Sequence, residues 1–246
     1  MQIKGAVGLV TGAARGIGLA FCVALLDNGA ATVRMLDICK EEGEKARQQL
    51  EKQFGPGTAK FTECDVTNKE DFAKAVKQTV IDHGKLDILC NNAGIINEKN
   101  WEKCVSINLN SVIHGTFVGL ETMSSGVIVN TASMGGLAPM SPTPVYCATK
   151  HGVVGFTRSI ATVAMKTKGI RVNCICPAFV DTPLLEKQIE EIPVTKALVA
   201  HLGTVKTDLV AKGLIELITD DTKNGAVMRV TAKTNIDYQE FQIQGV

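Results

Sequence analysis

The chain has 246 residues, and 45% of them are hydrophobic, which is enough for one sizeable buried core. Its 26 Lys and Arg residues nearly balance 25 Asp and Glu residues, leaving a formal net charge of +1 without a block of like charge. This balance gives no electrostatic reason to expect a nucleic acid or an anionic membrane as partner, so we expect a small-molecule ligand.

The cysteines and histidines carry no pattern of a disulfide framework or a metal site. Eight cysteines are scattered along apolar runs without a CxxC pair, and the four histidines lie apart from other residues at metal-ligand spacing. No segment approaches the ~20 apolar residues that a membrane-spanning helix needs, and the N-terminus lacks a signal-peptide pattern. We therefore expect no metal, no membrane span and a cytoplasmic protein with reduced thiols.

Short β-type runs alternate with helical patterns along the chain. We expect strands at residues 6–10, 32–36, 60–66, 86–90, 127–131, 170–176 and 227–231. This alternation predicts a single α/β domain over residues 1–246, with a Rossmann-type, doubly wound, parallel seven-stranded sheet and helices on both faces. Ligands of such sheets bind beyond the carboxyl ends of the strands, and the motifs described below fall at or near those ends.

A glycine-rich turn follows the first strand. Gly12, Gly16 and Gly18 stand between this strand and a helix expected at residues 19–26. Glycines permit a tight reversal and let backbone N–H groups approach a pyrophosphate at the helix N-terminus. The spacing GxxxGxG differs from the general GxGxxG fingerprint, and alone it is also compatible with an ordinary turn. Its place between a strand and a helix favours a phosphate-binding turn.

An acidic residue, Asp37, ends the second strand, where its carboxylate can accept hydrogen bonds from the ribose hydroxyls of a dinucleotide. Arg15 in the glycine turn could instead bind a 2′-phosphate, but Ile38 follows Asp37 where a second basic residue would strengthen that interpretation. We therefore favour NAD over NADP. The alternative role of Asp37 is to cap a helix that begins near Lys40.

Tyr146 and Lys150 are four residues apart, which places both side chains on one helical face. Thr143 and Pro144 just before them are typical of a helix N-cap and first helical position. A neighbouring ammonium group stabilises a phenolate and lowers the pKa of the phenol, so Tyr146 is a candidate general base. Taken alone, such a pair is more often a packing or surface pair.

Two further polar residues stand near strand ends or in apolar surroundings. Ser133 follows the strand at residues 127–131, where its hydroxyl could bond a substrate oxygen or merely cap a turn. Asn108 lies in an apolar helical pattern, so its amide needs partners such as a water or a backbone carbonyl, or else marks a kink. Residues 131–135 also half match the GxSxG motif of serine hydrolases, with His201 downstream, which keeps a hydrolase as a distant alternative.

As a set, these residues resemble the short-chain dehydrogenases/reductases over essentially the whole chain. The motifs that carry the resemblance, in order, are residues 11–18, 64–66 and 91–94, then Asn108, Ser133, residues 146–150 and residues 177–182. One departure is Ala178, where the family usually has glycine.

The resemblance implies a mechanism and a set of site residues. Tyr146 would be the general base that takes the proton of a secondary alcohol while a hydride goes to NAD, and Lys150 would lower the pKa of Tyr146 and bind the nicotinamide ribose. Ser133 would hold the substrate oxygen, and Asn108 would anchor a relay water. The implied cofactor contacts are Gly12, Arg15, Gly16, Ile17, Gly18, Asp37, Ile38, Cys64, Asp65, Val66, Asn92, Gly94, Tyr146, Lys150, Val180 and Thr182.

Within the family, the chain is most similar to members that oxidise the 15-hydroxyl of a prostaglandin or a related hydroxy fatty acid. Ser133, Thr143 and Tyr146 would contact the substrate, although Thr143 stands where a glutamine is expected. The cofactor-binding half would span about residues 1–135, and the apolar segment at about residues 180–204 would form a lid over a lipid-like substrate or simply pack on its own domain.

Other activities stay open at this point. A steroid, a retinoid or another secondary alcohol could be the substrate, and a non-catalytic NAD-binding protein is a more distant alternative. The resemblance also implies a homodimer or tetramer formed through the long helices after Asn100 and Thr143, with Gly152 and Gly155 permitting close helix approach.

Overall fold

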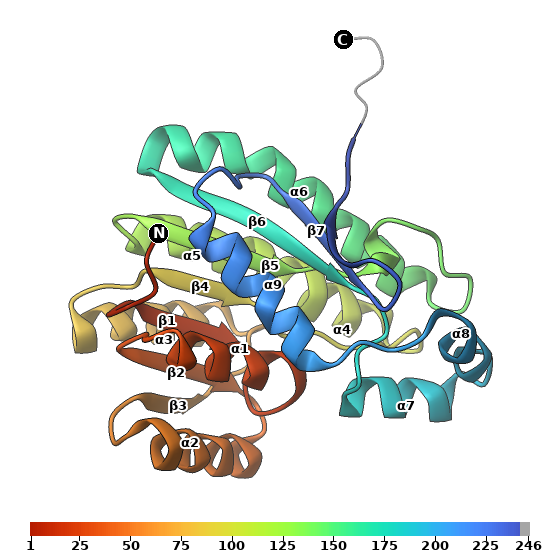
Figure 1. Ribbon diagram of the computed structural model, residues 1–246, viewed down its shortest axis with the longest axis horizontal. Helices are drawn as coiled ribbons and strands as arrows, with labels where there is room; N and C mark the ends of the chain where they lie inside the picture. The colour runs from red at the N-terminus through yellow and green to blue at the C-terminus, as the bar shows by residue number, and fades with distance from the viewer. Residues whose placement is uncertain (242–246) are drawn as a thin grey trace.

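The computed structural model describes residues 1–241 and contains one eight-stranded sheet with the order β3-β2-β1-β4-β5-β6-β7-β8 (Figure 1). The strands are β1 (Val7–Thr11), β2 (Thr32–Asp37), β3 (Ala59–Glu63), β4 (Ile88–Asn91), β5 (Gly126–Thr131), β6 (Ile170–Pro177), β7 (Val227–Thr231) and β8 (Asn235–Tyr238). The pairings from β3 through to β7 are parallel, and β8 pairs antiparallel with β7.

All seven predicted strands are present, with their ends shifted by a few residues, and the expected count of seven is corrected to eight. The additional strand β8 has the sequence Asn-Ile-Asp-Tyr, which is short and half polar and carries no strong strand pattern. It forms because β7 offers an open edge, and a two-point ion pair between Arg229 and Asp237 ties the two strands together with N···O distances of 2.6 Å.

Helices cover both faces of the sheet, as predicted. The helices are α1 (Gly16–Asp27), α2 (Lys40–Phe54), α3 (Lys69–His83), α4 (Trp101–Val105), α5 (Ser111–Thr122), α6 (Pro144–Lys168), α7 (Pro183–Glu191), α8 (Val194–Leu202) and α9 (Thr207–Thr219). A π-helical turn, Ser106–Asn110, joins α4 to α5, and a short 3₁₀ helix, Met134–Gly136, follows β5.

Two main apolar clusters form the core, one on each face of the sheet. Phe21, Leu25 and Leu214 belong to the cluster beneath α1, α2 and α9, whereas Phe72 and Val118 belong to the one beneath α3, α5 and α6. Strands covered on both faces are apolar along their whole length, which is why β1 and β4 are buried at every position.

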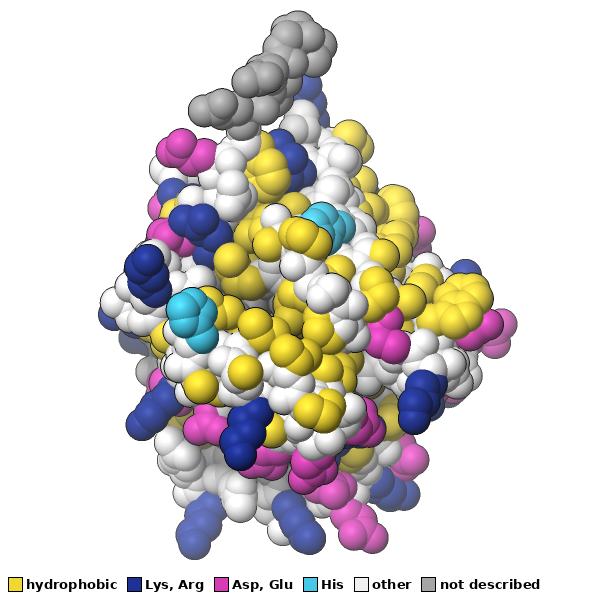
Figure 2. All heavy atoms as spheres, turned by 90° about the vertical axis from the view of Figure 1, so that its right-hand side faces the viewer, with side chains coloured by type: hydrophobic (Ala, Val, Ile, Leu, Met, Phe, Trp, Pro, Cys, Tyr) yellow, Lys and Arg dark blue, Asp and Glu magenta, His cyan; other side chains and the backbone are white. Residues whose placement is uncertain are grey.

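The sheet order places β1 between β2 and β4, so the chain reverses its direction of winding at β1 and β4. In doubly wound sheets a ligand binds at this switch point, beyond the carboxyl ends of the strands. Helices α7 and α8 are set apart from the sheet (Figure 1). Figure 2 views this side of the molecule and shows hydrophobic side chains gathered over the middle of the face, with charged side chains mostly around the rim.

Two expectations about the chain as a whole can be compared with the structure. All eight cysteines are free, and seven of them are buried, in agreement with reduced core thiols. Within residues 1–241, no helix combines the length and apolar character needed to cross a bilayer.

Candidate functional site

The four predicted catalytic residues come from three separate segments near the carboxyl ends of β4 and β5. Tyr146 and Lys150 lie in the first two turns of α6, and the Lys150 Nζ atom is 5.7 Å from the centre of the Tyr146 ring. Lys150 Nζ donates to the backbone oxygen of Thr131, at the end of β5, over 2.8 Å. A Cβ built on Gly94 would lie 3.5 Å from Lys150 Nζ and 3.4 Å from Asn108 Oδ1, so the loop after β4 lies directly against both side chains.

Burial controls the acidity of Tyr146 and Lys150. It raises the pKa of Tyr146 to about 12, against a hydrogen bond from Ser133 that acts to lower it. It lowers the pKa of Lys150 to about 8, because an ammonium ion loses hydration inside the protein. Burial is the largest cause of the Tyr146 pKa and raises it, and among the described residues Ser133 is the one group that acts to lower it, so a lowering of this pKa by Lys150 stays a prediction.

The amide of Asn108 is fully bonded within the protein. Asn108 Oδ1 accepts from the Ile95 N–H, and Asn108 Nδ2 donates to the Ile95 carbonyl, both over 2.8 Å. The residue lies in the π-helical turn, an irregularity of the helix, and the alternative that Asn108 marks a kink stays a prediction. Its predicted role in holding a relay water stays a prediction.

Ser133 caps the short helix Met134–Gly136, as its alternative interpretation predicted. Its Oγ accepts from the Gly135 N–H over 3.1 Å and donates to the Pro177 carbonyl over 3.5 Å. These bonds hold the hydroxyl between β5 and β6. Within residues 1–241 no histidine is bonded to Ser133, so the serine-hydrolase alternative lacks its general base.

The glycine turn is built to receive an anion. Gly12 and Gly16 have φ values of +64° and +58°, which only glycine adopts readily, and a Cβ on Gly18 would stand 2.1 Å from the Gly12 carbonyl oxygen. Helix α1 begins at Gly16, three residues earlier than predicted, so two of the glycines form its first turn. Among residues 1–241 no side chain caps this helix, and its first turn holds no acidic residue, which leaves its N–H groups available to a diphosphate.

Asp37 is bonded to the glycine turn. Its Oδ2 accepts from the Ala14 N–H and its Oδ1 from the Cys39 N–H, each over 3.0 Å. Asp37 does not cap α2, whose N-cap is Cys39, so that alternative is wrong. Two bonds leave unused acceptor positions on the carboxylate for ribose hydroxyls. The neighbouring side chains of Arg15 and Ile38 are exposed.

Other predicted cofactor residues differ in whether their side chains are buried or exposed. Asn92 connects the ends of β1 and β4, because its Nδ2 donates to the Thr11 carbonyl over 2.9 Å. The side chains of Cys64 and Val66 are buried, whereas Asp65 is exposed and accepts from the Thr67 N–H and hydroxyl. Val180 pairs with Val205 in an isolated parallel bridge. Thr182 lies next to the glycine turn, since its Cγ2 would be 3.3 Å from a Cβ on Gly16. Ile17 lies in the first turn of α1.

The arrangement of a glycine turn, an acidic strand end and a Tyr-Lys pair can now be compared with known proteins. Residues 6–193 match the sequence profile of the short chain dehydrogenase family. The chain belongs to this family.

Relatives of known function within the short-chain dehydrogenase family are similar over nearly the full length. The chain is 46% identical to the NAD(+) 15-hydroxyprostaglandin dehydrogenases of Mus musculus and Bos taurus, covering 99% and 98% of this chain respectively and 96% of each relative. Among solved structures, a levodione reductase has a TM-score of 0.86 at 28% identity, covering 94% of this chain and 98% of that one.

Sequence reasoning missed Glu98 in this short-chain dehydrogenase. Its carboxylate accepts from the backbone N–H groups of Val145 and Tyr146, the role that Thr143 was predicted to fill. Thr143 is the N-cap residue, as expected, but its side chain makes no cap bond. The signal for this contact in the sequence is weak, because it consists of one acidic residue in the loop after β4.

Thr143 is completely buried, and its hydroxyl has no hydrogen-bond partner among residues 1–241. A substrate contact by Thr143 therefore stays a prediction. Gly152 lies against Leu109 of the same chain, whose side chain would be 3.0 Å from an added Cβ, and its expected role in a close approach of helices between subunits stays a prediction.

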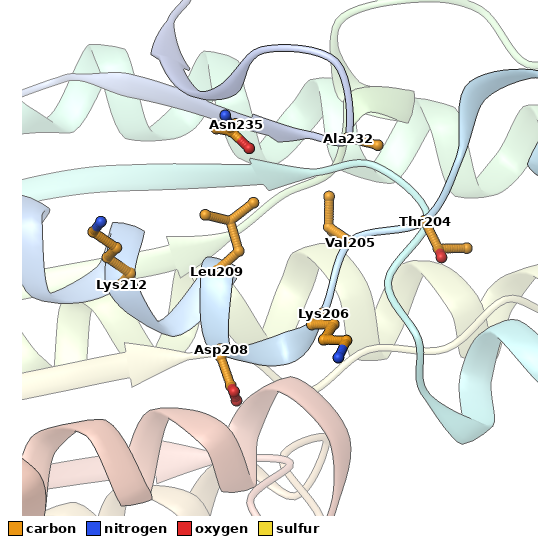
Figure 3. A pocket seen from close by; sticks show the side chains of 8 residues that line it. All are labelled: Thr204, Val205, Lys206, Asp208, Leu209, Lys212, Ala232 and Asn235. Atoms are coloured by element: carbon orange, nitrogen blue, oxygen red, sulfur yellow. The ribbon is translucent and has the colours of Figure 1, made fainter.

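A separate hollow lies between the start of α9 and the chain around Ala232 and Asn235 (Figure 3). Asp208 and Lys212 are charged residues on its α9 side. The hollow contains none of the predicted catalytic or cofactor residues, so it is not part of the site described above. Among the described residues, no cluster of His, Cys, Asp and Glu is suited to a metal ion.

Proposed function

We propose that this chain oxidises a secondary alcohol to a ketone with NAD, and that the alcohol is the 15-hydroxyl of a prostaglandin or a related hydroxy fatty acid. The observation that carries the proposal is the placement of Tyr146, with Lys150 and Ser133 beside it, at the same sheet edge as the uncapped start of α1. The near full-length similarity to NAD(+) 15-hydroxyprostaglandin dehydrogenases supports the choice of substrate.

The residues of the chain divide the chemistry among them. Ser133 donates a hydrogen bond to the substrate oxygen, and the ionised oxygen of Tyr146 takes the hydroxyl proton. Lys150 stabilises that anion once it forms and, with its pKa near 8, can itself exchange a proton near neutral pH. Bound NAD supplies the hydride acceptor.

Cofactor binding is assigned to the glycine turn and the ends of the central strands. The free N–H groups at the start of α1 suit the diphosphate, and the spare acceptor positions on Asp37 suit the adenosine ribose. The remaining assigned contacts are Gly12, Arg15, Gly16, Ile17, Gly18, Ile38, Cys64, Asp65, Val66, Asn92, Gly94, Tyr146, Lys150, Val180 and Thr182. Because their side chains are buried, Cys64 and Val66 would contribute backbone atoms.

We assign the lid to the excursion between Val180 and Val205, which carries α7 and α8. These two residues form an isolated parallel bridge at its base. The lid exposes three large apolar side chains, Leu184, Val194 and Leu202, which are 38–54% accessible, while Leu185 is buried. The exposed apolar side chains support a lipid-like substrate, and the buried Leu185 supports packing of the segment on its own domain.

Thr143 is kept as a proposed substrate contact beside Ser133 and Tyr146. A buried hydroxyl without a partner costs free energy, and a polar atom of the substrate would supply that partner.

Absorbance of reduced nicotinamide tests the proposed function. Purified protein is given NAD or NADP with a 15-hydroxyprostaglandin, a hydroxy fatty acid, a hydroxysteroid or retinol. Reduction of NAD by the prostaglandin, slower with the other alcohols and with NADP, is expected. Turnover of the steroid or retinol alone would change the substrate assignment to that alcohol. No turnover with any of the alcohols would contradict the proposed function.

We propose a homodimer through the outer faces of α5 and α6. Phe117 on α5 is 47% accessible and packs edge-to-face with Phe156 on α6, while Val163 is 53% accessible. Nothing lies within 4 Å of a Cβ built on Gly155, so a second helix could approach closely there. Light scattering should show a dimer that Phe117→Glu converts to a monomer, and a monomeric parent protein would contradict the proposal.

A further inference from the structure

A carboxylate from another segment holds the first turn of the helix that carries Tyr146. Glu98 Oε2 accepts from the Val145 N–H over 2.9 Å, and Glu98 Oε1 accepts from the Tyr146 N–H over 3.0 Å. An anion at a helix N-terminus satisfies free N–H groups and interacts favourably with the helix dipole. Unlike a cap from the preceding residue, Glu98 also fixes where the helix lies relative to the loop after β4.

The segment that bears Glu98 is fixed at its other end by the site itself. Ile95, three residues earlier, is bonded at both its N–H and its carbonyl by the amide of Asn108. The hydroxyl of Thr149 donates to the Tyr146 carbonyl over 2.7 Å and accepts from Asn108 Nδ2 over 3.3 Å. The backbone of Tyr146 is thus held at its N–H by Glu98 and at its carbonyl through Thr149.

We propose that Glu98 is a positioning residue, whose carboxylate fixes the Tyr146 phenol relative to Ser133 and Lys150. The inference rests on the proposed dehydrogenase function. A displacement of about 1 Å in a reacting group lowers rates by roughly 100-fold, and the bond to the N–H of Tyr146 itself restrains such a displacement.

Loss of Glu98 would also change the surroundings of the phenol. The groups facing Tyr146 are Lys150 and Cys147 from α6, Cys104 from α4, Cys176 from β6 and Ser133. Fraying of the first turn would admit water to the phenol. Because burial is the largest cause of the raised pKa of Tyr146, that pKa would fall toward its ordinary value of about 10.

The sequence allows this effect to be observed without turnover, because it contains only two tyrosines, Tyr146 and Tyr238. In a Tyr238→Phe background, tyrosinate absorbance reports Tyr146 alone, over the alkaline range in which circular dichroism shows the fold intact. Glu98→Ala should bring the onset of tyrosinate absorbance down by about one pH unit. The same change should lower kcat by roughly 10- to 100-fold and leave KM for NAD within about twofold.

Glu98→Gln and Asn68→Ala complete the experiment. The glutamine oxygen can still accept from one of the two N–H groups, so Glu98→Gln should give intermediate values and decides the result if Glu98→Ala does not fold. Asn68→Ala removes a comparable cap from α3, where Asn68 Oδ1 accepts from the Asp71 N–H over 3.2 Å. It should lower Tm without moving the tyrosinate onset or kcat.

The outcomes separate the two proposals. If the Glu98 variants lower only Tm, as Asn68→Ala does, Glu98 is an ordinary helix cap and the inference is overturned. If the parent protein oxidises no alcohol, the proposed function fails, and an unchanged or shifted tyrosinate onset still decides whether Glu98 governs the position of Tyr146.

Discussion

Helices α1 and α6 both begin near the carboxyl ends of the central strands, yet a side chain binds the first N–H groups of α6 and, among the described residues, none binds those of α1. The first turn of α1 contains two glycines, has no side-chain cap and has no acidic residue. The first turn of α6 is occupied by the carboxylate of Glu98, which accepts from two of its N–H groups. One helix start is left open for an anionic ligand, and the other is closed by an anion of the protein.

This difference follows from what each helix start has to do. The N–H groups of α1 can bind a diphosphate only if no side chain competes for them. Helix α6 carries Tyr146 and Lys150, whose positions matter to within a fraction of an ångström, so its N–H groups serve to fix the helix. On the proposed function, the diphosphate of NAD binds at α1 and proton transfer takes place at α6, so we expect that the two can be disturbed separately.

The largest expected effect separates proton transfer at α6 from binding at α1. Tyr146→Phe should lower kcat/KM by about 10²- to 10⁴-fold, because the general base is lost, while the Kd for NAD rises by only a few-fold, because Tyr146 is one of many assigned cofactor contacts. Steady-state rates and calorimetric titration of NAD measure the two quantities. Tyr238→Phe is the control, since it loses only a bond to Glu216 and should keep full activity. Equal loss of NAD binding in Tyr146→Phe would contradict the separation.

The converse change acts on α1. Gly18→Ala would place a methyl group 2.1 Å from the Gly12 carbonyl, so the turn must open and NAD should bind roughly 10- to 100-fold more weakly. Unaltered binding in Gly18→Ala would show that the turn does not hold the cofactor.

The proposed preference for NAD over NADP depends on Asp37, which is bonded to the glycine turn before α1. Asp37→Asn removes the charge that repels a 2′-phosphate and keeps an acceptor for the Ala14 N–H, so the preference for NAD over NADP should fall by about tenfold or more. The ratio of kcat/KM with NAD to kcat/KM with NADP measures this preference. A preference that does not change would place the discrimination elsewhere in the turn.

The buried ammonium group of Lys150, in α6, lowers the free energy of unfolding by an amount that depends on pH. Burial lowers the pKa of Lys150 to about 8, below its value in the unfolded chain, so the unfolded chain binds more protons between about pH 8 and about pH 10. The contribution of Lys150 to the free energy of unfolding should therefore rise with pH in this interval, by on the order of 1–2 kcal/mol. Buried thiols such as Cys22 and Cys90, whose pKa burial raises, contribute a fall over the same interval, so the rise is measured as the difference between the parent protein and Lys150→Met. Urea denaturation of both proteins at each pH measures the difference, and parallel curves would contradict it.

The smallest expected effect concerns Thr143, directly before α6. Thr143→Val keeps the shape and removes an unpartnered buried hydroxyl, so the free energy of unfolding should be unchanged or slightly higher. If the hydroxyl contacts the substrate, KM for the alcohol should rise by a few-fold, about 0.5–1 kcal/mol. An unchanged KM would assign Thr143 to packing alone.

Several features of the fold and site could be predicted because they depend on short stretches of sequence. The seven parallel strands follow from apolar runs between turn residues, and the glycine turn follows from the spacing of Gly12, Gly16 and Gly18. The four-residue spacing of Tyr146 and Lys150 placed them on one face of a helix before any tertiary contact was known. Strand β8 was missed because its short, half-polar sequence depends on the edge of β7.

The sequence by itself therefore determined the α/β fold and the short-chain dehydrogenase family, and it supplied the candidates for the cofactor turn and the reacting side chains. Only the tertiary structure decided which partners these side chains meet. Glu98 and Tyr146 are 48 positions apart, and Asn108 and Ile95 are joined across a loop, so no local pattern announces either contact. The direction of the Tyr146 pKa was also decided there, since the cost of removing a charge from water depends on the atoms packed around it.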